Sequence, residues 1–186
     1  NKFDTLLKGE LSPDMIACLI AEPLQGEGGF IVPPKGYLKR LQEICNQNNI
    51  VFIVDEIQAG FCRTGKFFCC EYADVTPDLI TTSKSLAAGF PLSAVVGRSE
   101  MMDAAGSGGL GGTFSGNPVS LAAAKVVIEK MLRDDFAGKA NHIGKVMMPR
   151  IKAMQEKYSV IGDVRGLGAM IALELVKDKA TKEPDK

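Results

Sequence analysis

The chain has 186 residues, and its 22 lysines and arginines balance 22 aspartates and glutamates, so the formal net charge is zero. Hydrophobic residues make up 46% and charged residues 24%, which is typical of a folded globular protein and excludes a disordered chain. Balanced charge gives no basic surface of the kind that binds nucleic acid or an anionic membrane. The one histidine, His142, excludes a multi-histidine metal site.

The edges of the chain and its cysteines favour a cytoplasmic protein. No apolar run follows a basic start, and the longest apolar run, residues 15–21, is far shorter than the about 20 residues that span a bilayer. The five cysteines contain no CxxC pair, and two of them are the neighbours Cys69 and Cys70. Vicinal cysteines form poor structural disulfides, so we expect reduced thiols.

The first half of the chain predicts strands that alternate with a helix. The apolar run Met15–Ala21 predicts a strand buried on both faces, and residues 37–48 have the 3.6-residue period of an amphipathic helix. A second buried strand is expected at Ile50–Val54, and the short connections favour parallel pairing with the first. Shorter strands are expected at Leu79–Thr82 and Ser93–Gly97.

The second half predicts a glycine-rich loop, two helices and a strand. Residues 106–112 are mostly glycine and predict a flexible or tightly turned loop. A helix is expected to begin at Pro118 with Asn117 as its cap. The remaining expected elements are a helix from Asp134 to Tyr158, a turn at Gly166–Gly168, a strand at Ile171–Val176 and a frayed end at 177–186.

Functional side chains collect where the predicted strands end. Glu22 closes the first strand, Asp55 closes the second, and Lys84 follows the third. Ligands of open parallel sheets bind at the carboxyl ends of the strands, so these side chains are candidates for one pocket. On pattern alone, Asp55 is equally consistent with a turn or a helix cap, and Lys84 with a solvated surface lysine.

The glycine-rich stretch Gly106–Thr113 invites a phosphate-binding interpretation. It lacks the Gly-Lys-Ser/Thr of a Walker loop and the preceding strand of a dinucleotide fingerprint. Backbone amides and the Thr113 hydroxyl are still able to hold a phosphate. A surface linker is the alternative.

Five segments, taken in order, resemble one set of known motifs. They are Glu22–Gly29, Val54–Gly65, Thr82–Leu92, Gly111–Pro118 and Gly162–Gly168. Together they resemble the class III, fold-type I pyridoxal-phosphate aminotransferases, and within that family those that act on 4-aminobutyrate. One such motif can arise by chance, but five in the family order are specific, and the likeness covers nearly the whole chain.

The resemblance implies a role for each matched residue around the cofactor, pyridoxal 5'-phosphate. Lys84 would bind the cofactor as a Schiff base and move a proton during the reaction. Asp55 would pair with the pyridine nitrogen and keep it protonated, which preserves the ring as an electron sink. Gln58 would donate to the phenolic oxygen, and Ile57 would pack against a ring face.

Two further residues are implied to contact the substrate and the neighbouring subunit. Glu27 would pair with a substrate-binding arginine, which lets one site accept an omega-amino acid in one half-reaction and a 2-oxo diacid in the other. Thr113 would contact the phosphate from a neighbouring subunit, so the active form would be a homodimer or a dimer of dimers. The partners implied are small-molecule amino acids and 2-oxo acids, with no metal, nucleic acid or membrane.

The resemblance also implies an α/β fold, in which a three-layer, mostly parallel sheet forms the major domain of a pyridoxal-phosphate transferase. Residues 1–133 would be the central part of that cofactor-binding domain, and residues 134–186 a linking helix and the start of an α+β small domain. Family members are much longer than this chain. We therefore expect a central fragment, without the phosphate-binding turn that comes first or the arginine partner of Glu27 that comes last.

The reaction implied moves the amino group of 4-aminobutyrate to 2-oxoglutarate, giving succinate semialdehyde and glutamate. Other omega-aminotransferases of the family, acting on acetylornithine, ornithine or 5-aminovalerate, are the alternatives, as is a fragment that is inactive by itself. Arg63 and Arg165 lie in the motifs, in turns where a structural role is equally consistent. A nucleotide-binding module that uses the glycine-rich loop is disfavoured by the absence of a Walker lysine.

Overall fold

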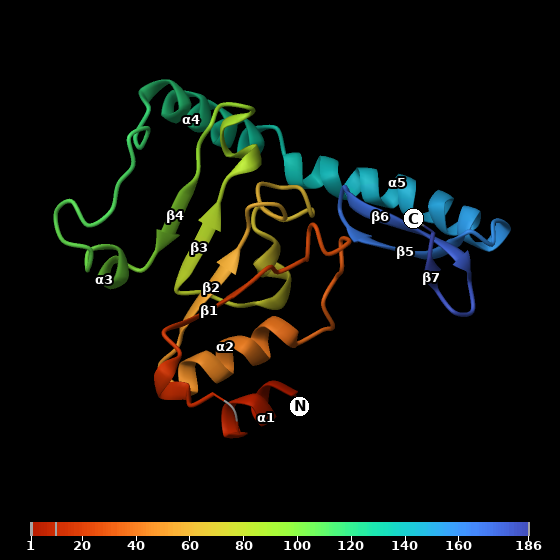
Figure 1. The fold of residues 1–186 in the computed structure, drawn as a ribbon. Coiled ribbons are helices and arrows are strands. Elements are labelled where there is room, and N and C mark those ends of the chain that lie inside the picture. The colour runs from red at the N-terminus through yellow and green to blue at the C-terminus, as the bar shows by residue number, and fades with distance from the viewer. Residues whose placement is uncertain (1, 10, 186) are drawn as a thin grey trace.

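A four-stranded sheet organises the first part of the computed structural model, which describes residues 2–9 and 11–185. Its strands lie in chain order: β1 (Cys18–Ala21), β2 (Val51–Asp55), β3 (Leu79–Thr82) and β4 (Ala94–Gly97). β1, β2 and β3 are parallel, as predicted for the first two, whereas β4 is antiparallel to β3 (Figure 1). The carboxyl ends of the three parallel strands therefore meet at one edge.

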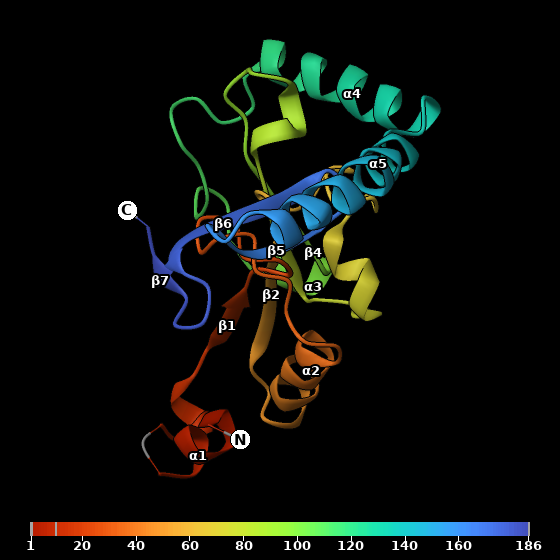
Figure 2. The ribbon, with the colours of Figure 1, turned by 90° about the vertical axis from the view of Figure 1, so that its right-hand side faces the viewer.

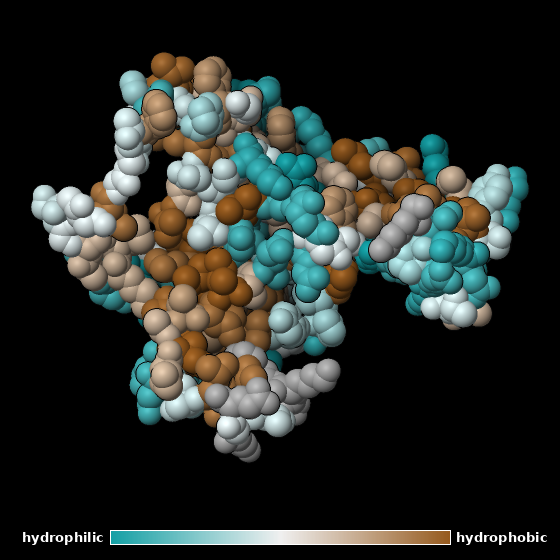
Figure 3. All heavy atoms as spheres, in the orientation of Figure 1, coloured by the Kyte–Doolittle hydropathy of each residue, from teal (hydrophilic) through white to brown (hydrophobic). Residues whose placement is uncertain are grey.

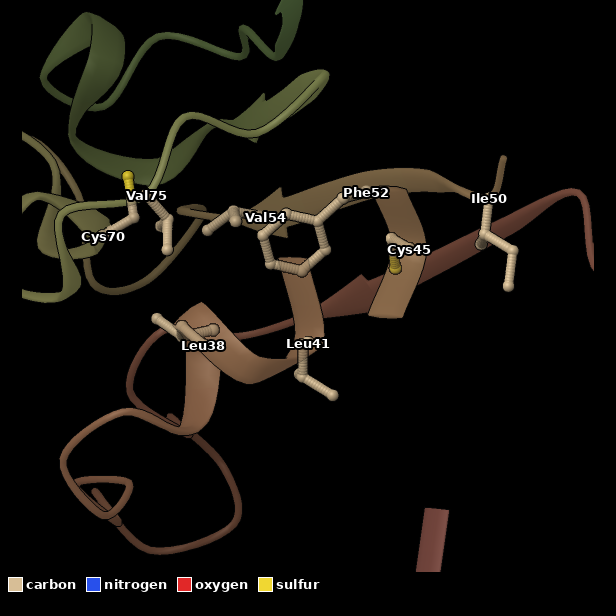
Figure 4. Packing of buried hydrophobic residues seen from close by; sticks show 8 residues of the cluster. All are labelled: Leu38, Leu41, Cys45, Ile50, Phe52, Val54, Cys70 and Val75. Carbon is tan, nitrogen blue, oxygen red and sulfur yellow. The ribbon is translucent and has the colours of Figure 1, made fainter. Parts of the chain in front are cut away.

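Helix α2 (Tyr37–Gln47) covers one face of this sheet. The predicted period is confirmed, because its buried positions recur along one side and meet the inward face of β2. Figure 4 shows the cluster: Leu38, Leu41 and Cys45 from α2, Ile50, Phe52 and Val54 from the second strand and its approach, and Cys70 and Val75. Burying a side chain such as Phe52 contributes about 1.5–3 kcal/mol, so this cluster anchors the strand that ends at Asp55.

The expectation that the first strand is buried on both faces is wrong. Residues Pro13–Met15 form a 3₁₀ turn, so β1 begins only at Cys18, and Cys18 and Ile20 are exposed. The cause is that, among the described residues, α2 covers only one face of the sheet, so the side chains of β1 on the other face stay exposed. Figure 3 shows apolar side chains over the other face, where Ile20 and Val95 remain exposed.

Short elements precede, connect and follow the strands of this sheet. They are α1 (Lys2–Gly9), α3 (Ser99–Met102) and the 3₁₀ turns Cys69–Ala73 and Lys84–Ala87. Residues 103–117, which we call the strap, connect α3 to α4 and contain the loop predicted at 106–112. The strap stands away from the body (Figures 1 and 3), and its Leu110 and Phe114 are 71% and 86% exposed.

Two helices follow the strap. In α4 (Pro118–Arg133), the predicted cap is confirmed, because Asn117 Oδ1 accepts hydrogen bonds from the amides of Val119 and Ser120. The inner face of α4 packs on the 3₁₀ turn that begins at Lys84. Helix α5 (Phe136–Lys157) begins two residues later than predicted, since Asp135 serves as its cap. None of the described helices is long and apolar enough to cross a membrane.

A separate antiparallel sheet follows α5 and packs along it (Figures 1 and 2). It contains β5 (Ile161–Leu167), β6 (Met170–Asp178) and β7 (Glu183–Pro184). The predicted strand at 171–176 is confirmed, but two expectations here are wrong. The turn expected at Gly166–Gly168 lies at residues 168–169, because Gly166 and Leu167 pair within β5, and the end predicted to fray contains β7. The glycines of β5 weaken its strand pattern in the sequence. Glycine is needed at position 162 for the pairing with β6, because a Cβ there would meet Val176 Cγ1 at 2.5 Å.

Candidate functional site

Asp55 and Lys84 lie at the same edge of the four-stranded sheet. Asp55 is the last residue of β2, and its partner in the parallel register is Thr81 of β3. Lys84 lies two residues after the end of β3, beyond Ser83, and begins the 3₁₀ turn Lys84–Ala87. Because β2 and β3 are neighbours and parallel, the carboxylate and the amine leave the sheet at adjacent strand ends.

The Asp55 carboxylate is half-buried and only partly used within the chain. Its Oδ1 accepts a hydrogen bond from the amide of Ile57 at 3.0 Å, which closes the turn after β2. On the neighbouring strand and the same face, Thr81 Oγ1 is buried and has no hydrogen-bond partner among the described residues. Buried hydroxyls are normally satisfied. An unpaired hydroxyl beside an accessible carboxylate therefore suits a polar ligand.

The backbone of Lys84 has an unusual conformation. Its φ of 45° lies in the left-handed region, which costs a residue with a Cβ about 1–3 kcal/mol. Both neighbours hold it there: Ser83 Oγ donates to the carbonyl of Leu92 at 3.0 Å, and Arg63 Nη2 donates to Ser85 Oγ at 2.6 Å. The Lys84 side chain is exposed and makes no ion pair with any described residue. Its amine is therefore available to a ligand.

Gln58 joins the turn after β2 to the loop after β1. Its amide oxygen lies so close to Gly26 that a Cβ at that position would overlap it. The Gly26 amide in turn donates to Glu22 Oε2 at 2.7 Å. Glu22, which closes the first strand, therefore braces this loop.

Glu27 lies on the loop that Glu22 braces. It is exposed, and it makes no hydrogen bond or ion pair with any described residue. It lines a hollow of about 500 Å³ together with Arg165 and Glu174 from the second sheet. Its carboxylate is therefore free to pair with a cation from outside the described residues.

Thr113 is not brought to Asp55 and Lys84 within the chain. It lies on the strap, is exposed, and has no hydrogen bond to a described residue. In Figures 1 and 2 the strap and the turn that begins at Lys84 lie apart. Ile57, by contrast, belongs to the turn directly after Asp55 and is half-buried.

Glu56 is a residue that the sequence interpretation missed. It is fully buried, and its two oxygens accept the amides of Cys69 at 3.0 Å and Cys70 at 2.7 Å. Burial raises the pKa of Glu56 and outweighs these amide hydrogen bonds, which lower it. The signal was the acidic doublet: successive residues at a strand end point to opposite sides, so one carboxylate faces the site and the next faces the interior.

Comparison with known proteins agrees with this arrangement of motifs. The family description "Aminotransferase class-III" matches residues 1–185. A probable 4-aminobutyrate aminotransferase of Bacillus subtilis is 47% identical over 184 residues, which cover 99% of this chain and 42% of that protein. A leucine/methionine racemase of Thermococcus litoralis is also 47% identical, over 176 residues that cover 95% of this chain and 40% of that protein.

A solved structure gives the same picture at the level of the fold. The taurine:2-oxoglutarate aminotransferase of Bifidobacterium kashiwanohense, in complex with PLP and glutamate, superposes with a TM-score of 0.93 at 33% identity, covering 98% of this chain and 42% of that one. The chain thus spans about two fifths of the length of the curated relatives it matches. The family match over almost every residue leads to one conclusion: the chain belongs to the class III aminotransferases.

Proposed function

We propose that this chain serves in a pyridoxal-phosphate-dependent aminotransferase that moves the amino group of 4-aminobutyrate to 2-oxoglutarate, giving succinate semialdehyde and glutamate. The observation that carries the proposal is that Asp55 and Lys84 lie at the ends of adjacent parallel strands. In this proposal residues 1–133 contribute to the cofactor-binding domain, and residues 134–186 form a linking helix and part of a small domain.

The residues at the strand ends fit the cofactor's chemistry. Asp55 offers an accessible carboxylate that would hold the proton of the pyridine nitrogen, and Gln58 an amide that would donate to the phenolic oxygen. Ile57 supplies an apolar surface for one face of the ring. The unpaired hydroxyl of Thr81 is an additional donor at the same place. Bound pyridoxal phosphate supplies an electron-withdrawing ring that stabilises negative charge at the substrate carbon.

Lys84 is proposed as both the covalent anchor and the proton carrier. An exposed amine with no ion-pair partner among the described residues is free to attach the cofactor through Nζ. Once released, Nζ would take and return the proton at the substrate carbon as a general base and acid. The left-handed backbone at Lys84, fixed through Ser83 and Ser85, would aim the amine toward the Asp55 side of the edge.

Glu27 is proposed to set the choice of substrate. Its unpaired carboxylate would hold an arginine from outside the described residues while the site accepts an omega-amino acid, which has no second carboxylate near its amine. Release of that arginine would let it bind the additional carboxylate of 2-oxoglutarate. One site would thereby serve both half-reactions.

A homodimer, or a dimer of dimers, is proposed as the active form, because the strap presents Leu110, Thr113 and Phe114 to solvent. Thr113 would then contact the cofactor phosphate of the neighbouring subunit. Mixing inactive Lys84→Ala and Thr113→Ala subunits tests this. Shared sites predict recovery of about a quarter of the activity by random pairing, whereas sites built from one subunit predict none beyond that of each variant alone.

Amino transfer by the cofactor-loaded enzyme that contains this chain tests the reaction itself. The donors to compare are 4-aminobutyrate, 5-aminovalerate, ornithine, acetylornithine and taurine, with 2-oxoglutarate as acceptor. We expect the highest kcat/KM with 4-aminobutyrate, loss of turnover in Lys84→Ala, and unchanged turnover in Lys152→Ala, a control on the exposed side of α5. A higher kcat/KM with another donor would assign the chain to another omega-aminotransferase.

Two alternative outcomes have specific support. The racemase relative is as similar in sequence as the aminotransferase relative, so racemisation of leucine and methionine is assayed in parallel. An inactive fragment is the outcome if the 186-residue chain neither binds the cofactor nor catalyses amino transfer.

We also propose a cytoplasmic location, because all five cysteines, four of them buried, are free thiols.

A further inference from the structure

Arg165 of β5 connects the second sheet to the loop that carries Glu27. Its Nε donates to the carbonyl of Gly29 at 2.8 Å, across 136 residues of sequence. In Figures 1 and 2 the loop after β1 lies beside the end of β5 and β6, as this contact requires. No other side-chain hydrogen bond of the described residues joins β5 or β6 to this loop.

The charge of Arg165 is already neutralised. Its Nη1 donates to Asp163 Oδ2 and to Glu174 Oε2, each at 2.6 Å, and its side chain is only 20% exposed. The guanidinium is therefore held between two carboxylates of its own sheet. It contacts the loop through a neutral carbonyl, and it neither pairs with Glu27 nor remains free to bind an anionic substrate.

The loop that Arg165 contacts is a tight turn. The amides of Gly29 and Phe30 both donate to the carbonyl of Gly26, at 3.0 and 3.1 Å, and Gly29 has a φ of 111°. Glu22 holds the start of the turn through the Gly26 amide at 2.7 Å. Arg165 holds its end, so that Glu27 lies between two fixed points.

We propose that Arg165 is a positioning residue that fixes the Gly26–Gly29 turn and thereby the place of the Glu27 carboxylate. The consequence for substrate choice rests on the proposed function, in which Glu27 holds the substrate-binding arginine. The carboxylates of Asp163 and Glu174, which neutralise Arg165, are needed for this role. If they were removed, the free guanidinium would attract Glu27, which lines the same hollow.

Hydrogen exchange of the 186-residue chain tests the positioning role without any catalysis. In Arg165→Met, we expect the Gly29 and Phe30 amides to exchange about ten- to a hundred-fold faster, the loss that removal of a charge-assisted hydrogen bond implies. Amides of β2 should keep their wild-type rates. Lys177→Met is the matched control, because within the described part of the chain Lys177 of β6 pairs with Glu183 and has no hydrogen bond or ion pair to the loop.

Two results would overturn the proposal. One is unchanged exchange at Gly29 and Phe30 in a folded Arg165→Met chain. If that variant does not fold, Arg165→Lys decides, because lysine keeps the positive charge but lacks the planar fork that contacts two carboxylates and a carbonyl. Faster loop exchange with unchanged β2 then supports the proposal, and unchanged loop exchange overturns it.

Half-reaction kinetics of the cofactor-loaded enzyme test the consequence for substrate choice. In Arg165→Lys, we expect kcat/KM for 4-aminobutyrate to fall about ten-fold, and that for 2-oxoglutarate to change less than about two-fold. Equal losses in both half-reactions would contradict a role through Glu27. If the wild-type enzyme does not transfer amino groups at all, the proposed function fails, while the exchange experiment still judges Arg165.

Discussion

Replacing Glu56 with alanine should destabilise the chain strongly, because this carboxylate is fully buried and holds two backbone amides. Without it, the amides of Cys69 and Cys70 lose the only acceptor that they have among the described residues. A buried donor left unsatisfied costs about 1–3 kcal/mol, so the two together imply a loss of about 2–6 kcal/mol. Glu56→Gln keeps one acceptor oxygen and turns the other into a donor, and we expect a smaller loss of about 1–3 kcal/mol.

Urea unfolding followed by circular dichroism measures these losses, with the exposed Glu43→Ala on α2 as a control. Comparison across pH isolates the charge of Glu56. Because burial raises its folded pKa above 4.5, the part of its contribution that comes from protonation is full below about pH 4.5 and is lost as the pH rises through the folded pKa. The advantage of wild type over Glu56→Gln should therefore narrow as the pH rises.

Two results would refute this reasoning. A Glu56→Ala chain within about 0.5 kcal/mol of wild type would show that the two amides find other partners. A wild-type advantage that widens with rising pH would show that the two amide hydrogen bonds, and not burial, determine the folded pKa of Glu56.

Three further predictions concern the helices and the thiols. Asn117→Ala removes the cap of α4 and should cost about 1 kcal/mol in urea unfolding, whereas Asn117→Asp should cost little, and equal losses would contradict the capping role. Gly144→Ala should cost about 1–3 kcal/mol, because its Cβ would meet the Gly168 carbonyl at 2.5 Å; a thermal midpoint equal to wild type would contradict this close approach. Burial raises the pKa of Cys69 to about 12, so alkylation at pH 8 followed by peptide mapping should label the exposed Cys18 first, and equal labelling rates would count against the packing around Cys69.

Local features of the fold were predictable from the sequence. The period of residues 37–48 gives α2, and Asn117-Pro118 gives the start of α4, because each depends on side chains within a few residues. Asp55 and Lys84 fall at one edge because their strands are short, apolar and parallel. These are consequences of strand and helix geometry that need no knowledge of distant contacts.

Features that depend on distant parts of the chain were not predictable. The end of β5 was predicted as part of a turn at Gly166–Gly168, because its glycines weaken the strand pattern, and only pairing with β6 shows that Gly162 must lie against Val176. The contact between Arg165 and Gly29 joins two segments separated by 136 residues. The strap is a loop in the sequence prediction and in the structure. A position for Thr113 at a neighbouring site, however, depends on a second subunit.

Reduction of the cofactor-loaded enzyme with borohydride tests the central claim most directly. The reagent fixes a cofactor bound to a lysine amine, and peptide mapping by mass spectrometry then identifies the lysine. We predict a pyridoxyl group on Lys84, with other lysines such as Lys66 unlabelled. A label on any other lysine, or none on an enzyme that has bound the cofactor, would contradict the assignment of the sheet edge between Asp55 and Lys84 as the cofactor site.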